Sequence, residues 1–101
     1  MKQGNITKLT MIKPLCVGQK LDEKSYVCEL LSYDKQQEMI SVILKEEELI
    51  KLSLDAIYEC QILGEDAVFA CTGKIVERFC DKEGNNVRLQ VKNGFYKINI
   101  K

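Results

Sequence analysis

The sequence contains no histidine, no tryptophan, one proline and only two arginines among its 15 basic residues. Without histidine there is no imidazole, which is the commonest general acid and base and a member of the usual hydrolase triad. The glycine motifs GxxxxGK and GxGxxG, which bind phosphates, are missing because the six glycines are scattered. The sequence therefore predicts a protein that is not an enzyme and that has no catalytic residue and no cofactor.

Long apolar runs and a charge excess are also missing. The longest unbroken apolar run is Ala67–Cys71, far short of the ~20 residues that cross a bilayer. Acidic and basic residues number 15 each, so no net field attracts nucleic acid or anionic lipid. The first 14 residues, MKQGNITKLTMIKP, lack an apolar stretch. We therefore expect no secretory signal, no membrane partner and a cytoplasmic location.

The five cysteines are odd in number and form no CxxC pair. Together with the absence of histidine, their spacing excludes the familiar zinc and haem patterns, so we expect no metal site. We interpret them as free thiols that serve as small core residues in a reducing compartment. Cys80, which lies close to Arg78 and Lys82, is the one candidate for a reactive thiol. The cysteines are Cys16, Cys28, Cys60, Cys71 and Cys80.

Alternating apolar and polar residues, separated by turn signals, predict an all-β fold. At this length we expect a small antiparallel, split-barrel-like β-barrel of about six to seven strands, since closure removes exposed edges. Three acids ahead of Leu49 indicate at most one short helical turn or a loop. The segments with the strand pattern are 26–33, 38–44, 56–63, 67–80, 87–92 and 96–101.

The domain organisation predicted is simple. Residues 1–13 form an N-terminal arm or an extra strand, and residues 14–101 form a single β-barrel domain. Gly73 is expected to bend the long strand 67–80. Asn93-Gly94 predicts a hairpin, because both residues tolerate the left-handed backbone of a type I′ turn. Core packing is the expected role of four residues on one face of the long strand, Phe69, Cys71, Ile75 and Phe79.

Residues 17–92 resemble the N-terminal domain of YcgR-like flagellar brake proteins, the PilZN family. The most distinctive match is an aromatic-x-Cys-x-Gly-x-Val-Val-x-Arg pattern, present here as Phe69–Phe79. The other matching segments are Gly18–Leu21, Ser25–Cys28, Ile57–Cys60 and Val87–Val91.

The resemblance implies a split-barrel-like domain of the kind that precedes a PilZ domain, which binds cyclic di-GMP. In the family the nucleotide site uses an Arg-x-x-x-Arg motif and a later Asp/Asn-x-Ser-x-x-Gly motif. Neither is present in this sequence, where Arg78 and Arg88 lie ten residues apart, so we expect no direct cyclic-di-GMP site. The resemblance therefore implies a non-catalytic regulatory module of cyclic-di-GMP signalling that works by protein–protein contact. Its partner would be a flagellar protein, a signalling protein, a separate PilZ protein or a second copy.

The last predicted hairpin is the candidate interaction edge, because a terminal strand presents unpaired backbone groups. Its proposed contact residues are Val87, Leu89, Val91, Tyr96, Ile98 and Ile100. One alternative is a split barrel that binds flavin or another small molecule. A second alternative is a small barrel that binds nucleic acid, which needs a basic groove with exposed aromatic rings. We expect no nucleic acid partner, because most aromatic residues fall on faces assigned to the core.

Overall fold

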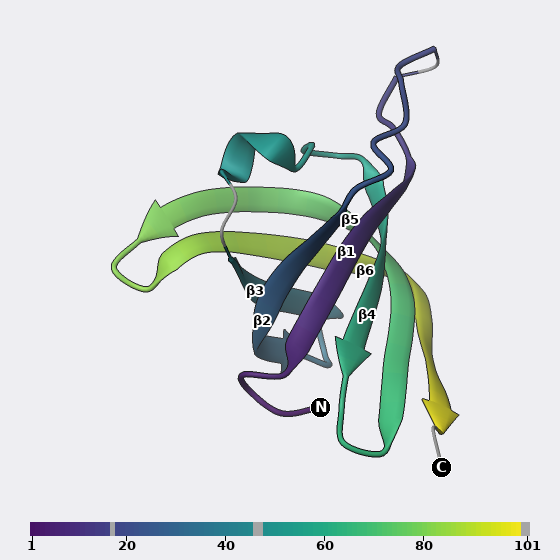
Figure 1. Ribbon diagram of the computed structural model, residues 1–101, viewed down its shortest axis with the longest axis vertical. Coiled ribbons are helices and arrows are strands. Elements are labelled where there is room, and N and C mark those ends of the chain that lie inside the picture. Colours follow the sequence, from purple (N-terminus) through teal and green to yellow (C-terminus); the bar gives the residue numbers. More distant parts are fainter. Residues whose placement is uncertain (17, 46–47, 100–101) are drawn as a thin grey trace.

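The computed structural model describes residues 1–16, 18–45 and 48–99. Within them, six antiparallel strands close into a barrel in the order β1-β2-β3-β6-β5-β4, which confirms the predicted all-β barrel (Figure 1). The one helical segment of the described residues is a 3-10 turn, and none of their helices is long and apolar enough to span a bilayer. The elements are β1 (Ile6–Lys13), β2 (Ser25–Asp34), β3 (Met39–Leu44), η1 (Leu49–Lys51), β4 (Ile57–Leu63), β5 (Ala67–Asp81) and β6 (Gly84–Asn99).

Strand β1 belongs to the barrel wall. It pairs with β2 from Ile6 to Thr10 and with β4 from Ile6 to Lys13, so both of its edges are covered. The buried side chains of Leu9 and Met11 enter the core. The sequence predicted either an arm or an extra strand for residues 1–13. Residues 6–13 form a strand.

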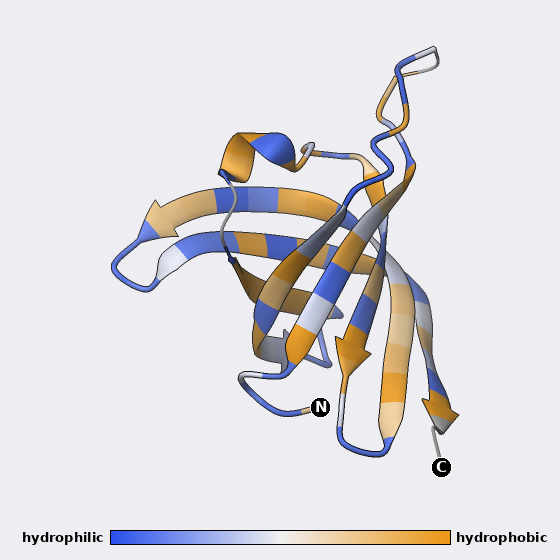
Figure 2. Ribbon diagram, viewed as in Figure 1, coloured by the Kyte–Doolittle hydropathy of each residue, from blue (hydrophilic) through white to orange (hydrophobic). Residues whose placement is uncertain are grey.

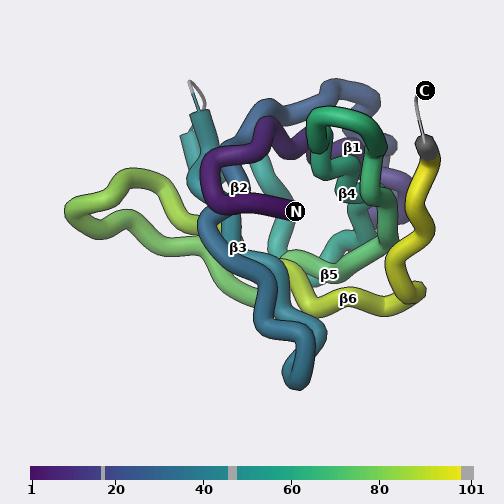
Figure 3. The backbone as a smooth tube through the Cα atoms, turned by 90° about the horizontal axis from the view of Figure 1, so that it is seen from below, coloured from purple at the N-terminus to yellow at the C-terminus, as the bar shows by residue number. Residues whose placement is uncertain are grey.

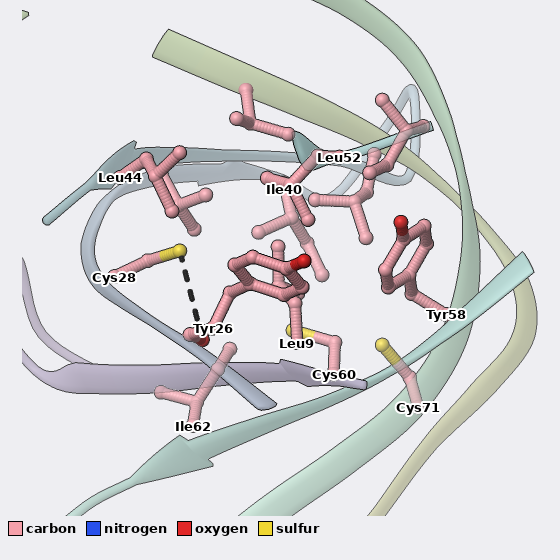
Figure 4. Packing of buried hydrophobic residues seen from close by; sticks show 14 of the residues in the cluster. Leu9, Tyr26, Cys28, Ile40, Leu44, Leu52, Tyr58, Cys60, Ile62 and Cys71 are labelled. Atoms are coloured by element: carbon pink, nitrogen blue, oxygen red, sulfur yellow. Dashed lines mark hydrogen bonds between the residues drawn. The ribbon is translucent and has the colours of Figure 1, made fainter. Parts of the chain in front are cut away.

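The core fills the barrel interior, as strict alternation along the strands requires. In β3 and β4 every second residue is buried, and the residues between them are half-buried. Orange and blue bands accordingly alternate along part of β4, whereas β3, with the sequence MISVIL, is hydrophobic almost throughout (Figure 2). Side chains from several strands converge on the interior, with the rings of Tyr26 and Tyr58 at its centre (Figure 4). Its largest fully buried aliphatic members are Leu9, Ile40, Leu52, Ile62, Ile75 and Leu89.

Strand β5 changes face part-way along its length. Its pairing with β6 shifts register between Ile75 and Glu77, so one residue of β5 is left without a partner on β6. Beyond such a bulge every side chain moves to the opposite face. Arg78 therefore points to the inner face, and Phe79 is 39% exposed. The prediction that Phe79 shares the core face of Ile75 is wrong for this reason. A further shift, between Thr72 and Gly73, leaves Lys92 of β6 without a partner, and at Gly73 the backbone of Gln90 approaches closely, as the missing side chain permits.

Strand β6 runs without a break through Asn93-Gly94, so the hairpin predicted there is wrong. Gly94 is not among the residues with positive φ, which a type I′ turn would require. The chain reverses earlier, at Lys82-Glu83, where Gly84 has a φ of 123°. Partners on β5 along almost its whole length explain why pairing prevails over the local turn preference of Asn93-Gly94.

Strand β6 is paired along both edges in its first half and along one edge only in its second half. β3 covers one edge of β6 from Asn85 to Gln90, and the amide of Val91 donates to the Glu38 carbonyl at 2.9 Å. From residue 92 to residue 99, β5 is the only strand that pairs with β6 within the described residues. The distal part of β5, residues 76–81, likewise pairs with β6 alone and forms the hairpin that projects from the barrel (Figure 1).

Candidate functional site: the free end of β6 and the barrel opening

Burial divides the six predicted contact residues into two groups. Val87 and Leu89 are fully buried and Val91 is 5% exposed, so these three belong to the core and present no contact surface. Tyr96 and Ile98 are 53% and 49% exposed. Ile100 lies outside the described residues. The candidate contact surface is thus reduced to the C-terminal half of β6.

Tyr96 and Ile98 form an apolar patch on the outer face of the barrel, together with Val68 of β5. Ile98 pairs directly with Val68, and Tyr96 pairs with Ala70. Residues that face each other across antiparallel strands lie on the same side of the sheet. We call Val68, Tyr96 and Ile98 the outer patch. It borders the edge of β6, residues 92–99, that has no second strand among the described residues.

The edge of β6 is cationic. The sequence of the strand contains Arg88, Lys92 and Lys97 and no acidic residue. Arg88 is compensated by Glu77 of β5, since its Nη1 lies 3.2 Å from the carboxylate. Lys92 and Lys97 are exposed, and both belong to the half of the strand with the free edge.

The N-terminus lies across the opening at one end of the barrel (Figure 3). At this end an aromatic groove includes Met1 in its lining. Its volume is about 510 Å³. The rings of Tyr33 and Phe95 meet edge to face, with centroids 4.9 Å apart and planes at 73°. The Lys97 ammonium lies 5.9 Å from the centroid of the Phe69 ring. We call this surface the mouth groove; it is lined by Met1, Tyr33, Lys35, Phe69, Phe95, Tyr96 and Lys97.

Sequence reasoning missed the mouth groove, because it placed most aromatic residues in the core. That placement is right for Tyr26 and Tyr58, which are buried. Phe69 and Phe95 are only half-buried, since they lie where the barrel opens. The one signal of this surface in the sequence is the run Phe95-Tyr96-Lys97, in which two aromatic residues and a cation are adjacent.

The opposite end of the barrel is closed by a plug. Leu52, directly after η1, is fully buried, and its backbone carbonyl accepts a hydrogen bond from Arg78 Nη1. The same nitrogen donates to the Leu49 carbonyl at 3.3 Å. The amide of Ser53 donates to the Tyr58 hydroxyl at 3.0 Å. Burial raises the pKa of Tyr58 and keeps this phenol neutral. Arg78 is therefore a structural latch at this end.

The interpretation of the five cysteines as core residues is right for three of them and wrong for two. Cys28, Cys60 and Cys71 are buried, and Cys16 and Cys80 are exposed. Burial in the apolar core raises the pKa of Cys28 to about 12. The pKa of Cys60 is also raised, first by its hydrogen bond with Cys71 and then by burial. Within the described residues no three His, Cys, Asp or Glu side chains gather as a metal site would need.

Arg78, one of the two cations that made Cys80 a candidate for a reactive thiol, is engaged at the plug. The guanidinium of Arg78 donates to the carbonyls of Leu49 and Leu52 at the plug. The Cys80 thiol instead contacts the Asp81 carbonyl, at 3.9 Å.

Comparison with known proteins adds no name to this geometry: no family model, no curated protein and no solved structure matches the chain.

Proposed function

We propose that this protein is a non-catalytic binding module that docks an extended segment of a partner protein along the free edge of β6. In this proposal the barrel is a relative of the N-terminal domain of YcgR-like flagellar brake proteins. The partner is then a flagellar or signalling protein, or a separate PilZ protein. The six-strand antiparallel barrel and the Phe69–Phe79 segment, with its register shift at Gly73, support this relationship.

The observation that carries the proposal is the free edge itself. Residues 92–99 of β6 have β5 on one side and no second strand on the other among the described residues. Backbone N–H and C=O groups on such an edge pair readily with an added strand, while pockets and patches beside it select side chains. Here the outer patch supplies the apolar contact, through Tyr96 and Ile98.

Charge favours a different protein over a second copy as the partner. Lys92 and Lys97 on two copies of the same edge would face one another, and lysines on an edge oppose self-pairing. The same lysines attract carboxylates. The partner segment expected is therefore extended, with apolar residues at alternate positions and acidic residues between them or next to them.

The test is selection of binding peptides from a displayed random library, followed by affinity measurement on individual peptides. We expect enrichment of alternating apolar and acidic sequences, with affinity that falls as salt is raised. Ile98→Lys in the outer patch should abolish binding. The matched control is Ile12→Lys on β1, because Ile12 is 50% exposed and Ile98 is 49% exposed. Binding to the control variant should equal that of the wild type.

Two results would overturn the proposal. Equal loss of affinity in the Ile98 and Ile12 variants would show that the outer patch has no special role. A dimer in sedimentation velocity that dissociates on Ile98→Lys would assign the edge to a second copy instead of a partner.

A further inference from the structure

We infer that the mouth groove is a binding site for a planar aromatic anion, a small molecule in which an aromatic ring system carries a phosphate or a similar group. The inference goes beyond the proposed function, since it concerns a small ligand and the inner side of the barrel opening. The groove is an open hollow with a volume of about 510 Å³. Small-molecule sites typically have volumes of 300–1,000 Å³.

The lining of the groove fits a flat ring. Four of its seven residues are aromatic, and they come from three parts of the fold: Tyr33 from β2, Phe69 from β5, and Phe95 and Tyr96 from β6. None of these rings is fully buried. Tyr33 and Phe95 already pack edge to face, which leaves ring surface for a third partner in an offset or edge-to-face arrangement.

Charge in the groove fits an anion. The charged side chains that line it among the described residues are Lys35 and Lys97, and no carboxylate lines it. In a chain with as many acids as bases, this is a local excess of positive charge. Lys97 is held over the Phe69 ring, so its ammonium lies at the groove.

The acids near the groove are Asp34 and Glu38, whose charges act on Tyr33, and the pair Glu65 and Asp66. The Asp34 carboxylate accepts the amides of Gln36 and Gln37 at 3.0 and 3.1 Å, within its own turn. Glu65 and Asp66 line a smaller adjoining hollow of about 230 Å³. Lys97 lines that hollow as well as the groove, whereas Lys35 lines the groove alone. A bound anion therefore belongs on the groove side of Lys97, toward Lys35.

Tyr33 supplies a hydroxyl that stays protonated. Burial raises its pKa, and the charge of Glu38 raises it further. A neutral phenol can donate a hydrogen bond to a ligand without repelling its charge.

The test is an NMR titration of the 15N-labelled full chain with three probes: AMP, adenosine and ribose 5-phosphate. AMP carries both a ring and an anion, and each of the others carries only one of them. We expect saturable chemical-shift changes at Tyr33, Phe95 and Lys97 with AMP. Adenosine and ribose 5-phosphate should each bind at least about tenfold more weakly than AMP. Equal binding of all three probes, or no saturable binding of AMP, would overturn the inference.

A variant pair locates the site. Lys97→Gln should weaken AMP binding about tenfold, whereas Lys92→Gln, on the same strand but outside the groove lining, should leave it unchanged. Equal effects would overturn the inference. So would a single-stranded oligoadenylate that binds more than tenfold tighter than AMP, because it would assign the groove to nucleic acid.

The groove shares Tyr96 with the outer patch and Lys97 with the edge of β6, so the two outcomes are separated by Ile98, which belongs to the outer patch alone. Ile98 does not line the groove, so Ile98→Lys should abolish peptide binding and leave AMP binding unchanged. Loss of AMP binding in this variant would contradict two independent sites.

Discussion

The plug at the η1 end of the barrel provides a quantitative test of the fold, because it contains one fully buried side chain, Leu52, with the half-buried Leu49 beside it. Leu52 is fully buried, and Arg78 holds the turn that presents it by donating to the carbonyls of Leu49 and Leu52. Arg78 reaches this position only because the bulge between Ile75 and Glu77 turns it to the inner face. Plug, latch and bulge are therefore expected to be energetically linked.

The magnitudes follow from burial. Leu52→Ala removes a fully buried aliphatic side chain and should cost about 3 kcal/mol, within the usual range of 2–5 kcal/mol. Arg78→Met keeps the apolar stem but loses two hydrogen bonds from a charged group; because the side chain is half-buried, we expect about 1–2 kcal/mol. Against a total stability of roughly 5–15 kcal/mol, both losses are large enough to measure.

Urea unfolding of the two single variants and the double variant is the assay. We expect coupling of about 1 kcal/mol, because Arg78 positions the residue that Leu52→Ala truncates. Ile50→Ala in the same turn is the control: Ile50 is 72% exposed, so its loss should stay within about 0.5 kcal/mol. A cost for Ile50→Ala equal to that for Leu52→Ala, or strict additivity of the Leu52 and Arg78 effects, would refute the latch.

Three further predictions concern the wall and the core. In thermal melts Gly73→Ala should destabilise the protein by about 1–3 kcal/mol, because the new Cβ would lie 3.0 Å from the Gln90 carbonyl oxygen. Gly94→Ala should be neutral or slightly stabilising, because Gly94 has open space around it and no positive φ. The reverse order of stabilities would support the hairpin at Asn93-Gly94. The free energy of unfolding should fall as the pH rises from about 9 toward 12, because the Cys28 thiol ionises in the unfolded chain and stays protonated in the folded one. This one thiol contributes a loss of up to about 1.4 kcal/mol per pH unit. Urea midpoints that are the same at pH 8 and pH 10.5 would contradict this prediction. Ellman's reagent should label only the exposed Cys16 and Cys80 in the native protein and all five thiols in urea, so rapid native labelling of a third would show that the core is open.

Much of the fold was predictable because barrel strands with a buried face alternate strictly. The segments 26–33, 38–44, 56–63 and 67–80 correspond closely to β2, β3, β4 and β5. The short helical turn expected near Leu49 is confirmed as η1. The acids at 46 and 47 that suggested it lie outside the described residues.

The errors share one physical cause, which is that β5 and β6 pair over a long distance with bulges. The sequence does not show which residue a bulge will leave without a partner, so the face of Phe79 was assigned by simple alternation. At Asn93-Gly94 a strong local turn signal lost to pairing with β5 on both sides of it. Both errors fall on β5 and β6. For this reason the predicted contact edge included Val87 and Leu89, which are in fact buried.

The candidate site was half predictable. The terminal strand is where a free edge arises, and the exposure of Tyr96 and Ile98 fits the predicted contact role. The mouth groove needed the structure, because its aromatic residues come from β2, β5 and β6 and share no sequence pattern. Only closure of the barrel brings Tyr33 against Phe95.

Hydrogen exchange of the full chain, measured by mass spectrometry with and without the selected acidic peptide, tests the docking edge most directly. Without peptide, residues 85–90, which are paired on both sides, should exchange slowly, and residues 92–99 should exchange faster. Added peptide should slow exchange in 92–99 and leave residues 76–81, the other free edge, unchanged. Protection at 76–81 or in β1, with none at 92–99, would contradict the account.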